Sequence, residues 1–479
     1  MNEKSAVFML LILLSGAVMV GIVAPVMQVN ASISGLIYNS SYNVHSADKV
    51  QTMSTSLVDD PKASSTFTIL KTQIILIIYQ ACNQRGKSLE TESIYGKQIG
   101  VNVDGSDVAT TQTSPREDAE ANGGVVIWVG TLGAGSHTVK GRFASNKLTS
   151  SNPINRPYET TVTIHERRLT VVVFDGTADD FRFVRSTNVV TANSLSLVDD
   201  IEASFSFTSP ICKTLILYVA CNYNYTTEGS QGKRIAISTD GTDGLALGSA
   251  PFSADYADDE FVAEIRSLPA GSHTIKGRFA SNEDSKTVTV SERQFAVLFF
   301  PDGLETDFVE QFKQESFTSY ALTNDPDALV TRTTNGKRQV LAIYCTGKRM
   351  GTGDWGRKEA VNIDGVDYGL NAQSGFEHTP SGNLEDQHAA TMGIQSNVTE
   401  LSAGAHTVQG RLASYSPGII DDRQLCVLWF SIPVVGGVVL PSTWLQVQIV
   451  LLLSAVAVVL VLGMKKARAR PAYLLASKM

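Results

Sequence analysis

The stretch LGAGSHTVKGRFASN, which begins at Leu132, returns twice along the chain, as LPAGSHTIKGRFASN from Leu268 and as LSAGAHTVQGRLASY from Leu401. Three further motifs recur in the same order and at similar spacing, with the first copies SLVDDPKAS, GKQIGVNVDGSD and ERRLTVVVF. Self-similarity of this kind indicates that the chain repeats one structural unit. We place the three copies at residues 36–176, 177–303 and 304–432.

The repeated stretch has the pattern of a β-strand. Side chains of a strand alternate between its two faces, so Val139 and Phe143 share one face with His137. Lys140 and Arg142 lie on the other face, and we expect the apolar set to point inward. No segment between the two ends of the chain shows a convincing helical period.

The other motifs predict further strands and turns. The apolar runs IILIIY from Ile74, LILYVA from Leu215 and VLAIY from Val340 are short, which predicts strands buried on both faces. A later Asp-Gly pair in each copy favours a tight turn. Copies of about 120 residues with seven to nine short strands are typical of a β-sandwich. We predict an all-β fold of three tandem antiparallel β-sandwich domains with jelly-roll-like topology.

The run AGSHTVKGRFAS, followed after a gap by ERRLTVVVF, resembles the last strands of tumour-necrosis-factor/C1q-like jelly rolls of phage tail-fibre and bacterial surface proteins. The resemblance implies the fold and a display or recognition role, and it transfers no catalytic residue. Such relatives often form trimers. A membrane-tethered tandem array departs from that plan, so the resemblance does not imply a trimer for this chain. From the repeats and the predicted anchor we expect an outward-facing rod of three modules.

The C-terminal end predicts a membrane anchor. Residues 443–464 carry no charge, and at about 1.5 Å per residue they would form a helix long enough for the bilayer core. Trp444 lies at the outer edge of this span, where an amphipathic ring suits the headgroup region. Lys465, Lys466 and further basic residues follow, so the positive-inside rule places the tail at 465–479 in the cytoplasm.

The N-terminal end leaves two interpretations open. Residues 5–27 are uncharged and apolar, and Ala31 ends a plausible signal-peptidase site. Residues 1–31 are therefore a cleaved signal peptide or an uncleaved N-terminal anchor. Both interpretations predict a single-pass protein of the cell membrane with extracytoplasmic repeats and a cytoplasmic C-terminus.

Composition excludes several classes of protein. Charged residues make up 18% and hydrophobic residues 43% of the chain, which excludes a mostly disordered chain. Only two stretches are long enough to span a bilayer, which excludes a polytopic membrane protein. Lys and Arg number 39 against 47 Asp and Glu, so the net charge is −8. A nucleic-acid binder would usually show a basic footprint, and we expect no nucleic-acid partner.

Each recurring polar residue has a structural and a functional interpretation. The repeated histidines invite a metal or catalytic role, but we favour hydrogen-bonded residues that fix a turn. The repeated arginines invite an anionic ligand, but we favour pairing with repeated aspartates across the sandwich. The D-G-x-D pattern invites calcium, but we favour turn-capping aspartates. The histidines are His137, His273 and His406; the arginines are Arg142, Arg278, Arg411, Arg167, Arg293 and Arg423; the aspartates are Asp59, Asp60, Asp199, Asp200 and Asp325; and the pattern starts at Asp104, Asp240 and Asp364.

The five cysteines do not form a recognisable metal or redox motif, because no C-x-x-C occurs. An odd number in an exported chain leaves at least one unpaired or paired between chains. We favour small buried core residues over a disulfide framework. Cys212 and Cys221 are the one local pair for which a disulfide is worth testing.

Two sets of residues are candidates for surface roles. The sequons at Asn39, Asn224 and Asn397 are candidate glycosylation sites. Four aromatic residues are candidates to stack on a ligand such as a sugar: Trp355, Tyr158, Tyr223 and Tyr225. The stretches that differ most between copies are 147–159 and 370–395, and such segments on a common scaffold are where binding usually resides.

We therefore predict a membrane-anchored cell-surface protein with a structural or adhesive role, and with a cell-surface glycan or protein as partner. The alternative is a carbohydrate-binding surface module array. We expect no enzyme, because the chain has no G-x-S-x-G elbow, no H-E-x-x-H and no phosphate-binding glycine loop. We expect no cofactor and no metal.

Overall fold

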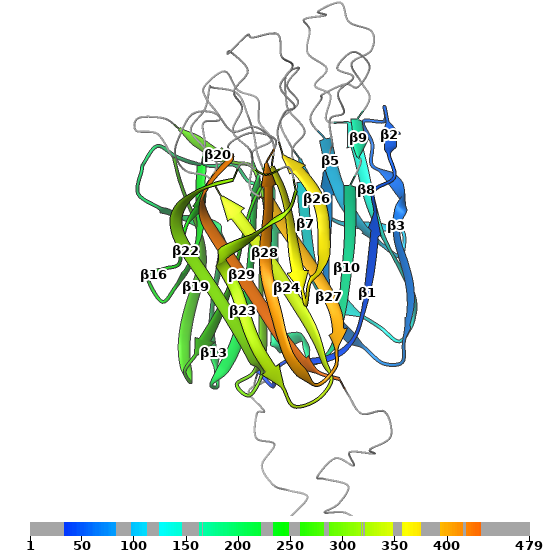
Figure 1. The fold of residues 1–479 in the computed structure, drawn as a ribbon, viewed down its shortest axis with the longest axis vertical. Helices are drawn as coiled ribbons and strands as arrows, with labels where there is room; N and C mark the ends of the chain where they lie inside the picture. The colour runs from blue at the N-terminus through cyan, green and yellow to red at the C-terminus, as the bar shows by residue number, and fades with distance from the viewer. Residues whose placement is uncertain are drawn as a thin grey trace, which may run out of the picture. The chain divides into compact units, whose positions relative to one another are not determined.

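The computed structural model describes residues 33–82, 97–112, 124–145, 162–164, 166–221, 233–248, 259–281, 287–317, 319, 321–347, 357–374, 393–414 and 418–432. These residues are all-β apart from one 3-10 turn, η1 (Ala178–Asp180) (Figure 1). The predicted signal or anchor at 1–31, transmembrane helix at 443–464 and tail at 465–479 lie outside them. In the described part, no helix has the length and apolar character to cross a membrane. The chain divides into two units, Met1–Ile432 and Pro433–Met479, and all described residues belong to the first.

The first repeat forms two four-stranded antiparallel sheets and a short ribbon. The inner sheet has the order β1 (Ile37–Ser46), β10 (Glu166–Asp175), β4 (Gln73–Cys82) and β7 (Gly124–Leu132). The outer sheet has the order β3 (Val58–Ile69), β8 (Gly135–Ser145), β5 (Lys97–Val103) and β6 (Ser106–Gln112). The ribbon pairs β2 (Val50–Thr52) with β9 (Val162–Ile164).

The second repeat has the same strand order. Its inner sheet is β11 (Phe181–Ser186), β21 (Glu292–Pro301), β14 (Cys212–Cys221) and β18 (Asp259–Leu268). Its outer sheet is β13 (Val198–Ser209), β19 (Gly271–Ser281), β15 (Lys233–Thr239) and β16 (Thr242–Asp243), with β17 (Leu247–Gly248) also paired to β15. The ribbon pairs β12 (Val190–Ala192) with β20 (Val288–Val290).

The third repeat again follows this order. Its inner sheet is β22 (Glu305–Phe317), β29 (Gly418–Ser431), β24 (Arg338–Gly347) and β27 (Gly393–Leu401). Its outer sheet is β23 (Thr323–Thr334), β28 (Gly404–Ser414), β25 (Arg357–Ile363) and β26 (Val366–Ser374). The repeat and β-sandwich character of the sequence is thus confirmed. The proposed boundaries fall between β10 and β11 and between β21 and β22, and the division into separate domains stays a prediction.

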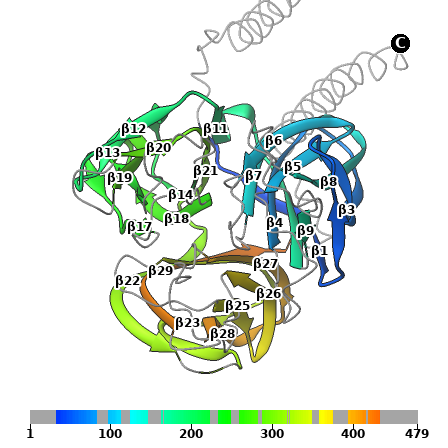
Figure 2. The same ribbon diagram turned by 90° about the horizontal axis from the view of Figure 1, so that it is seen from above.

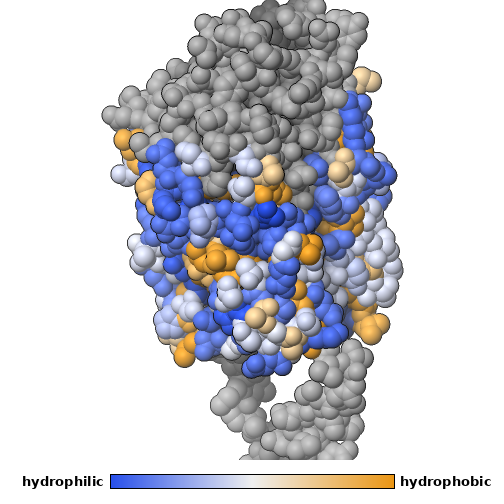
Figure 3. All heavy atoms as spheres, in the orientation of Figure 1, coloured by the Kyte–Doolittle hydropathy of each residue, from blue (hydrophilic) through white to orange (hydrophobic). Residues whose placement is uncertain are grey.

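The local sequence accounts for these strands. The three apolar runs form β4, β14 and β24, which are buried on both faces as predicted. In β8 the alternation holds, because Val139 and Phe143 are buried while Lys140 and Arg142 are partly exposed. On the face of the molecule in Figure 3, hydrophobic side chains are interspersed among hydrophilic ones.

The expectation of a rod with three separate cores is wrong. The outer and inner sheets of the first repeat enclose one buried apolar cluster, and those of the third repeat enclose another. The largest cluster, however, combines residues of all three repeats. At its centre the final phenylalanines of the three ERRLTVVVF-type motifs meet. The ring centroids of Phe174, Phe300 and Phe430 lie 5.6, 5.7 and 5.9 Å apart.

The three repeats also meet at three seams, which close a ring (Figure 2). Ile127 N of the first repeat donates to Gln294 Oε1 of the second at 2.6 Å. Cys426 Sγ of the third donates to the Ala263 carbonyl of the second at 3.3 Å. Asn43 Nδ2 of the first repeat donates to Asn397 Oδ1 of the third at 3.1 Å. A head-to-tail contact of this kind forms a ring when its rotation closes.

The physical reason for the error lies in the inner sheets. In β10 both faces are apolar: Leu169 and Val171 point into the first repeat's own cluster, whereas Val172 and Phe174 point into the shared one. A rod would leave that second face in water, at a cost of about 25 cal/mol for each Å² of apolar surface. A sheet whose strands are buried on both faces needs a packing partner on each face. The outer sheet covers one face of the inner sheet, and the neighbouring repeats cover the other.

The strand registers define two ends of each repeat. At one end, Gln73 of β4 pairs with Leu132 of β7, and Ile37 of β1 pairs with Asp175 of β10. We call this the turn end, because the short turns at 133–134 and 104–105 lie toward it. At the opposite end, Ala81 pairs with Gly124, and the strands stop where the chain enters segments outside the description. We call this the open end.

Candidate functional site

The three repeated histidines form identical clasps near the turn end. His137 Nδ1 donates to Asp104 Oδ2 at 2.6 Å, and His137 Nε2 donates to the Gly133 carbonyl at 2.8 Å. The Thr138 amide donates to the other oxygen of Asp104 at 2.8 Å. The same three contacts recur in the other copies. They join His273 to Asp240 and Pro269, and His406 to Asp364 and Ser402, with Thr274 and Thr407 as amide donors.

The backbone explains why these aspartates are followed by glycine. Asp104 and Gly105 have φ angles of +50° and +88°, which are the angles of a two-residue hairpin turn with both central residues in the left-handed region. Asp240 and Asp364 have φ angles of +51° and +52°. Aspartate tolerates this region because its short side chain bonds locally. The predicted tight turns are confirmed.

The clasp favours a charged histidine. A carbonyl and a carboxylate can only accept, so both ring nitrogens of His137 must donate, and the ring is then an imidazolium. The hydrogen bond to Asp104 raises the pKa of His137, against a smaller opposing effect of burial. Burial acts to raise the pKa of Asp104, but its bonds to His137 and Thr138 outweigh this and lower it. The prediction of histidines that fix a turn is confirmed.

A second repeated arrangement lies inside each sheet pair. Asp60 Oδ2 accepts a hydrogen bond from the Tyr79 hydroxyl at 2.9 Å and lies 2.8 Å from Arg167 Nε, and both charged side chains are fully buried. The Lys62 amide donates to Asp60 Oδ1 at 3.0 Å. The second repeat has the same network, with Asp200, Tyr218 and Arg293, and the third has Asp325, Tyr344 and Arg423.

A glycine makes room for each tyrosine. A Cβ on Gly141 would lie 2.4 Å from the Tyr79 ring, closer than real Cβ contacts allow. The same clash recurs at Gly277 against Tyr218 at 2.8 Å and at Gly410 against Tyr344. The buried network therefore explains three sequence motifs together: the aspartate of SLVDD, the glycine of KGRFAS and the arginine of ERRL.

The outer arginines pair with aspartates on the surface. Arg142 Nη1 donates to both oxygens of Asp107 at 2.8 and 2.9 Å, and Arg142 Nε lies 3.3 Å from Asp59. Equivalent pairs join Arg278 to Asp243 and Asp199, and Arg411 to Asp367. Structural pairing of the repeated arginines is thus confirmed. The second aspartate of D-G-x-D was not identified from the sequence as the bidentate partner. Asp107 lies on β6, and its side chain reaches Arg142 of β8 across the intervening strand β5.

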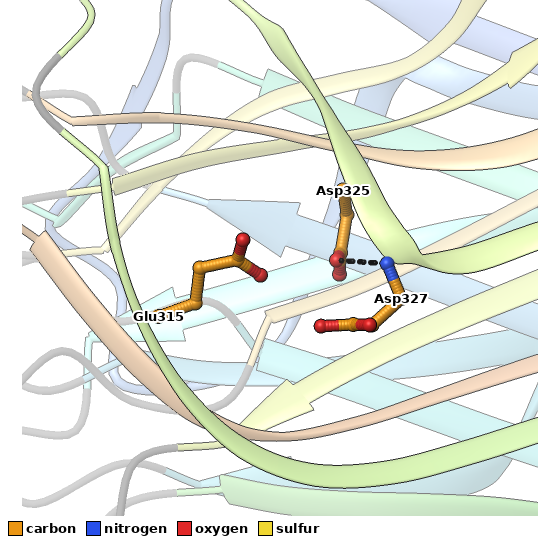
Figure 4. A group of neighbouring side chains, drawn as sticks. All are labelled: Glu315, Asp325 and Asp327. Atoms are coloured by element: carbon orange, nitrogen blue, oxygen red, sulfur yellow. Dashed lines mark hydrogen bonds between the residues drawn. The ribbon is translucent and has the colours of Figure 1, made fainter.

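Three carboxylates of the third repeat lie close enough to hold a cation: Glu315, Asp325 and Asp327 (Figure 4). Basic side chains of the same repeat already pair with these carboxylates. Arg423 Nη1 lies 2.8 Å from Asp327 and 3.3 Å from Glu315, and Lys313 Nζ donates to Asp327 at 2.7 Å. The Asp327 amide donates to Asp325 at 3.1 Å. The group is an ion-pair cluster around the buried network of this repeat.

The cysteines whose side chains the structure describes are free and buried: Cys212, Cys221, Cys345 and Cys426. Cys212 and Cys221 lie at the two ends of β14, about 30 Å apart at the usual rise of a strand, so they cannot form a disulfide. The interpretation of these cysteines as core residues is confirmed. The Cys82 side chain lies outside the description.

The predicted surface residues differ in where they fall. Asn39 is exposed on β1 beside a β-bulge between Tyr38 and Ser40. Asn397 is only 3% exposed, and its Oδ1 accepts from Asn43 and from Arg168 at the seam between the first and third repeats. A glycan on Asn397 would require that seam to open. The remaining candidates lie outside the described residues: Asn224, Trp355, Tyr158, Tyr223 and Tyr225.

The recurring histidines, and the arginines and aspartates that recur with them, are used in structural pairs that repeat in the three copies. The candidate site is instead the open end. In the first repeat, the strand ends that border 83–96, 113–123 and 146–161 pair with one another: Cys82 with Glu166, Gln98 with Gln112, and Lys97 with Ser145. The corresponding segments of the other repeats begin and end at the same strand ends. The phenylalanines of the three repeats meet toward the turn end, and the seam contacts between Ile127 and Gln294 and between Asn43 and Asn397 lie further toward the open end in both partners. The three open ends therefore point the same way.

The segments bordered by these strand ends differ among the repeats in length. The one at 146–161 corresponds to 282–286 in the second repeat and to 415–417 in the third. The stretches 147–159 and 370–395, singled out in the sequence, both begin or end at open-end strands. Their central residues lie outside the description.

Comparison with known proteins identifies no family. No family model matches the chain, and no curated protein matches it. Solved structures with partial likeness include PNGF-II, with 11% identity, a TM-score of 0.25, and coverage of 75% of this chain and 98% of that one. Tandem CBM51 modules of Sp3GH98 from Streptococcus pneumoniae SP3-BS71 match with 10% identity, a TM-score of 0.15, and coverage of 56% and 96%. VP2 of infectious bursal disease virus matches with 6% identity, a TM-score of 0.20, and coverage of 87% and 89%. At these TM-scores the likenesses carry no argument about function.

Proposed function

We propose that this chain is a membrane-anchored cell-surface protein in which three jelly-roll repeats form one closed unit with a structural or adhesive role. The described residues of each repeat form eight main strands in two sheets. The first strand lies beside the last in one sheet and the second beside the seventh in the other, an order that supports a jelly roll. The recognition surface is the open end, and the partner is a cell-surface glycan or protein.

The observation that carries this proposal is the position of the two described chain ends. Leu36 N donates to the Phe299 carbonyl at 2.7 Å, and Ser34 bonds Asp180, so the chain enters at the turn end. Ser431 pairs with Arg338, so the chain leaves at the turn end as well. The described part of the chain therefore begins and ends at the turn end, opposite to the strand ends that border the differing segments. An anchored protein needs this polarity to present its binding segments outward.

The anchoring is tested by expressing the full chain in cells and extracting their membranes. We expect the protein to resist alkaline carbonate and to dissolve only in detergent. An epitope placed within 375–392 should be accessible to antibody on intact cells, whereas an epitope after Met479 should require permeabilisation. Release by carbonate alone, or the reverse pattern of accessibility, would contradict the proposal.

The adhesive role is tested by exchanging one segment. Replacing residues 146–161 with the much shorter 282–286 segment of the second repeat leaves the bordering strands unchanged. We expect adhesion of expressing cells to fall while surface expression is kept. A glycan array probed with the same two proteins separates a sugar partner from a protein partner. Adhesion that is unchanged by this exchange, and also by replacement of residues 375–392 of the third repeat with a flexible linker, would remove the open end as the recognition surface.

A further inference from the structure

Glu264 of β18 is a buried carboxylate with incomplete partnering. Its side chain is fully buried, and its Oε2 accepts from Arg266 Nε at 2.8 Å and lies 2.7 Å from Arg266 Nη2. Its Oε1 has no hydrogen-bond partner within the described residues. A buried carboxylate that keeps its charge normally accepts several hydrogen bonds at both oxygens. Within the described part of the chain, Glu264 has donors at only one oxygen, so its charged form is weakly stabilised.

Glu264 lies at the seam between the second and third repeats. The carbonyl of the preceding residue, Ala263, accepts the hydrogen bond from Cys426 of the third repeat. The Arg266 guanidinium, which pairs with Glu264, lies 5.9 Å from the ring centroid of Phe308, also in the third repeat. The carboxylate is therefore held between two contacts that exist only while this seam is closed.

The charges around Glu264 are unbalanced. Two further acidic groups act on it, Asp243 of β16 and Glu310 of β22. Asp243 is itself bound by Arg278, and Glu310 is exposed and accepts from the Leu245 amide. These groups leave three carboxylates against two guanidinium groups at the seam.

Other strands packed on β18 bring no further cation to this carboxylate. β29 presents the Cys426 thiol, whose pKa burial raises well above its ordinary value. β14 presents Tyr218, whose hydroxyl is bound to Asp200. β15 has its two basic residues, Lys233 and Arg234, at its first two positions, at the opposite end from the residues that pair with β16. Lys213 of β14 donates to Ser267 at 2.6 Å. β24 has Arg338, which lies 3.4 Å from Glu305, Tyr344, which is bound to Asp325, and the thiol of Cys345, whose pKa burial raises well above its ordinary value. β7 and β17 contain no ionisable side chain.

The acid is particular to this seam. Glu264 pairs with Ile216 of β14, and the residues in the same register position of the other repeats are Trp128, opposite Ile77, and Asn397, opposite Ala342. Both are neutral. The other two seams therefore have no acid at this register position.

We propose that the seam between the second and third repeats closes with a proton on Glu264, so that it is held more tightly in mildly acidic than in alkaline surroundings. Burial raises the pKa of Glu264 from 4.5 to about 7, against a lowering by Arg266. A group whose pKa is raised in the closed state stabilises that state most below its ordinary value. This stabilisation is lost as the pH rises through about 7.

The test measures seam opening through the thiol of Cys426, which is fully buried and bonded across the seam. The full chain in detergent is alkylated, and the labelling of each cysteine is followed by peptide mass spectrometry. Cys221, whose thiol bonds Glu292 within the second repeat, serves as the internal reference and cancels the ordinary increase of thiol reactivity with pH. We expect the Cys426 to Cys221 ratio to rise at least about tenfold between pH 5.5 and pH 8.5.

The variant Glu264→Gln keeps the shape of the side chain and removes its charge, and we expect it to flatten this rise. The matched control is Glu400→Gln, an exposed glutamate of the third repeat that pairs with Lys337 of the same repeat, and it should keep the rise. A flat ratio in the unmodified chain would overturn the proposal, and so would a rise that persists in Glu264→Gln. Should Glu264→Gln fail to fold, the pH series of the unmodified chain decides the matter alone.

Discussion

The turn end and the open end of the repeats are built on opposite plans. At the turn end the three copies make the same contacts with nearly the same geometry. The hydrogen bond between histidine Nδ1 and aspartate is 2.6, 2.7 and 2.6 Å long in successive repeats. At the open end the strands stop at equivalent residues, but the segments that follow range from 146–161 to 415–417. The three repeats therefore share their sequence at the turns that close the hairpins, and they differ in the segments between the strands of the open end.

The comparison indicates that the residues that stabilise the fold are separate from the segments that we propose bind the partner. The buried networks of aspartate, arginine and tyrosine lie beneath the open end, because Arg167 pairs with Ala81 one residue from the end of β4. They hold the strand ends in place without using the segments beyond them. A rigid base of this kind permits segments to change without loss of the fold.

The largest effect is expected from breaking a buried network. Arg293→Met removes the partner of Asp200 and leaves a buried carboxylate without its cation. We expect a loss of about 3–5 kcal/mol in the free energy of unfolding, measured by urea denaturation of the full chain in detergent. Adding Asp200→Leu to the same chain should restore part of the loss. A loss below about 1 kcal/mol for Arg293→Met would show that the network is not essential for the stability of the strands beneath the open end.

A smaller loss is expected from filling the space beside the tyrosine. Gly410→Ala places a Cβ 2.4 Å from the Tyr344 ring, so the ring or the strand must shift. We expect a destabilisation of about 1–3 kcal/mol by the same denaturation measurement. Gly133→Ala is the matched control at the turn end, where a Cβ meets no atom within 4 Å. Equal effects of the two substitutions would contradict the packing described here.

The clasps should depend on pH. The pKa of His137 is raised above 6.5, so its contribution is complete below that pH and is lost as the pH rises through the raised value. The pKa of Asp104 is lowered below 3.8, so its contribution is complete above that pH and is lost in stronger acid.

The variant His137→Gln should therefore cost about 1 kcal/mol of unfolding free energy near pH 5.5 and less near pH 9. Both values come from urea denaturation in matched buffers. The Thr66→Ala variant, which loses a surface contact to Thr138 on the same sheet, is the control and should show no such pH dependence. A cost for His137→Gln that grows toward pH 9 would contradict the charged clasp.

The smallest effect on stability is expected at the open end. Replacing residues 375–392 with a flexible linker of equal length should change the free energy of unfolding by no more than about 0.5 kcal/mol, since no described strand is altered. Thermal unfolding of the two chains measures this. A loss of unfolding free energy comparable to that of Arg293→Met would mean that residues 375–392 are needed for the stability of the fold.

The sequence was sufficient for the repeats, the strands, and the structural roles of the recurring histidines and arginines. Alternation identified the buried face of β8, and the recurrence of histidine beside an Asp-Gly pair identified the clasp. The recurrence of arginines and aspartates predicted that the two sets pair, and the structure shows which partners meet, such as Arg167 and Asp60. These features are local or triplicated, so each copy supports the interpretation of the others.

The sequence was not sufficient for the way the repeats meet. Val172 and Phe174 of β10 have the same apolar character as Leu169 and Val171, and only the packing shows which pair faces a neighbouring repeat. Glu264 is one acid among 47 acidic residues, and its position at a seam depends on strand register and ring closure together. Contacts between residues as distant as 43 and 397 have no local signature.

The most direct test of the closed unit is a cross-link across the seam that completes it. With cysteines introduced by Asn43→Cys and Asn397→Cys, mild oxidation or a short bifunctional thiol reagent should join the first and third repeats within one chain. We expect a faster-migrating, reducible or reagent-dependent monomer band that is absent from each single variant. Only uncross-linked chains, or cross-links formed solely between chains, would contradict ring closure and restore a linear arrangement of the repeats.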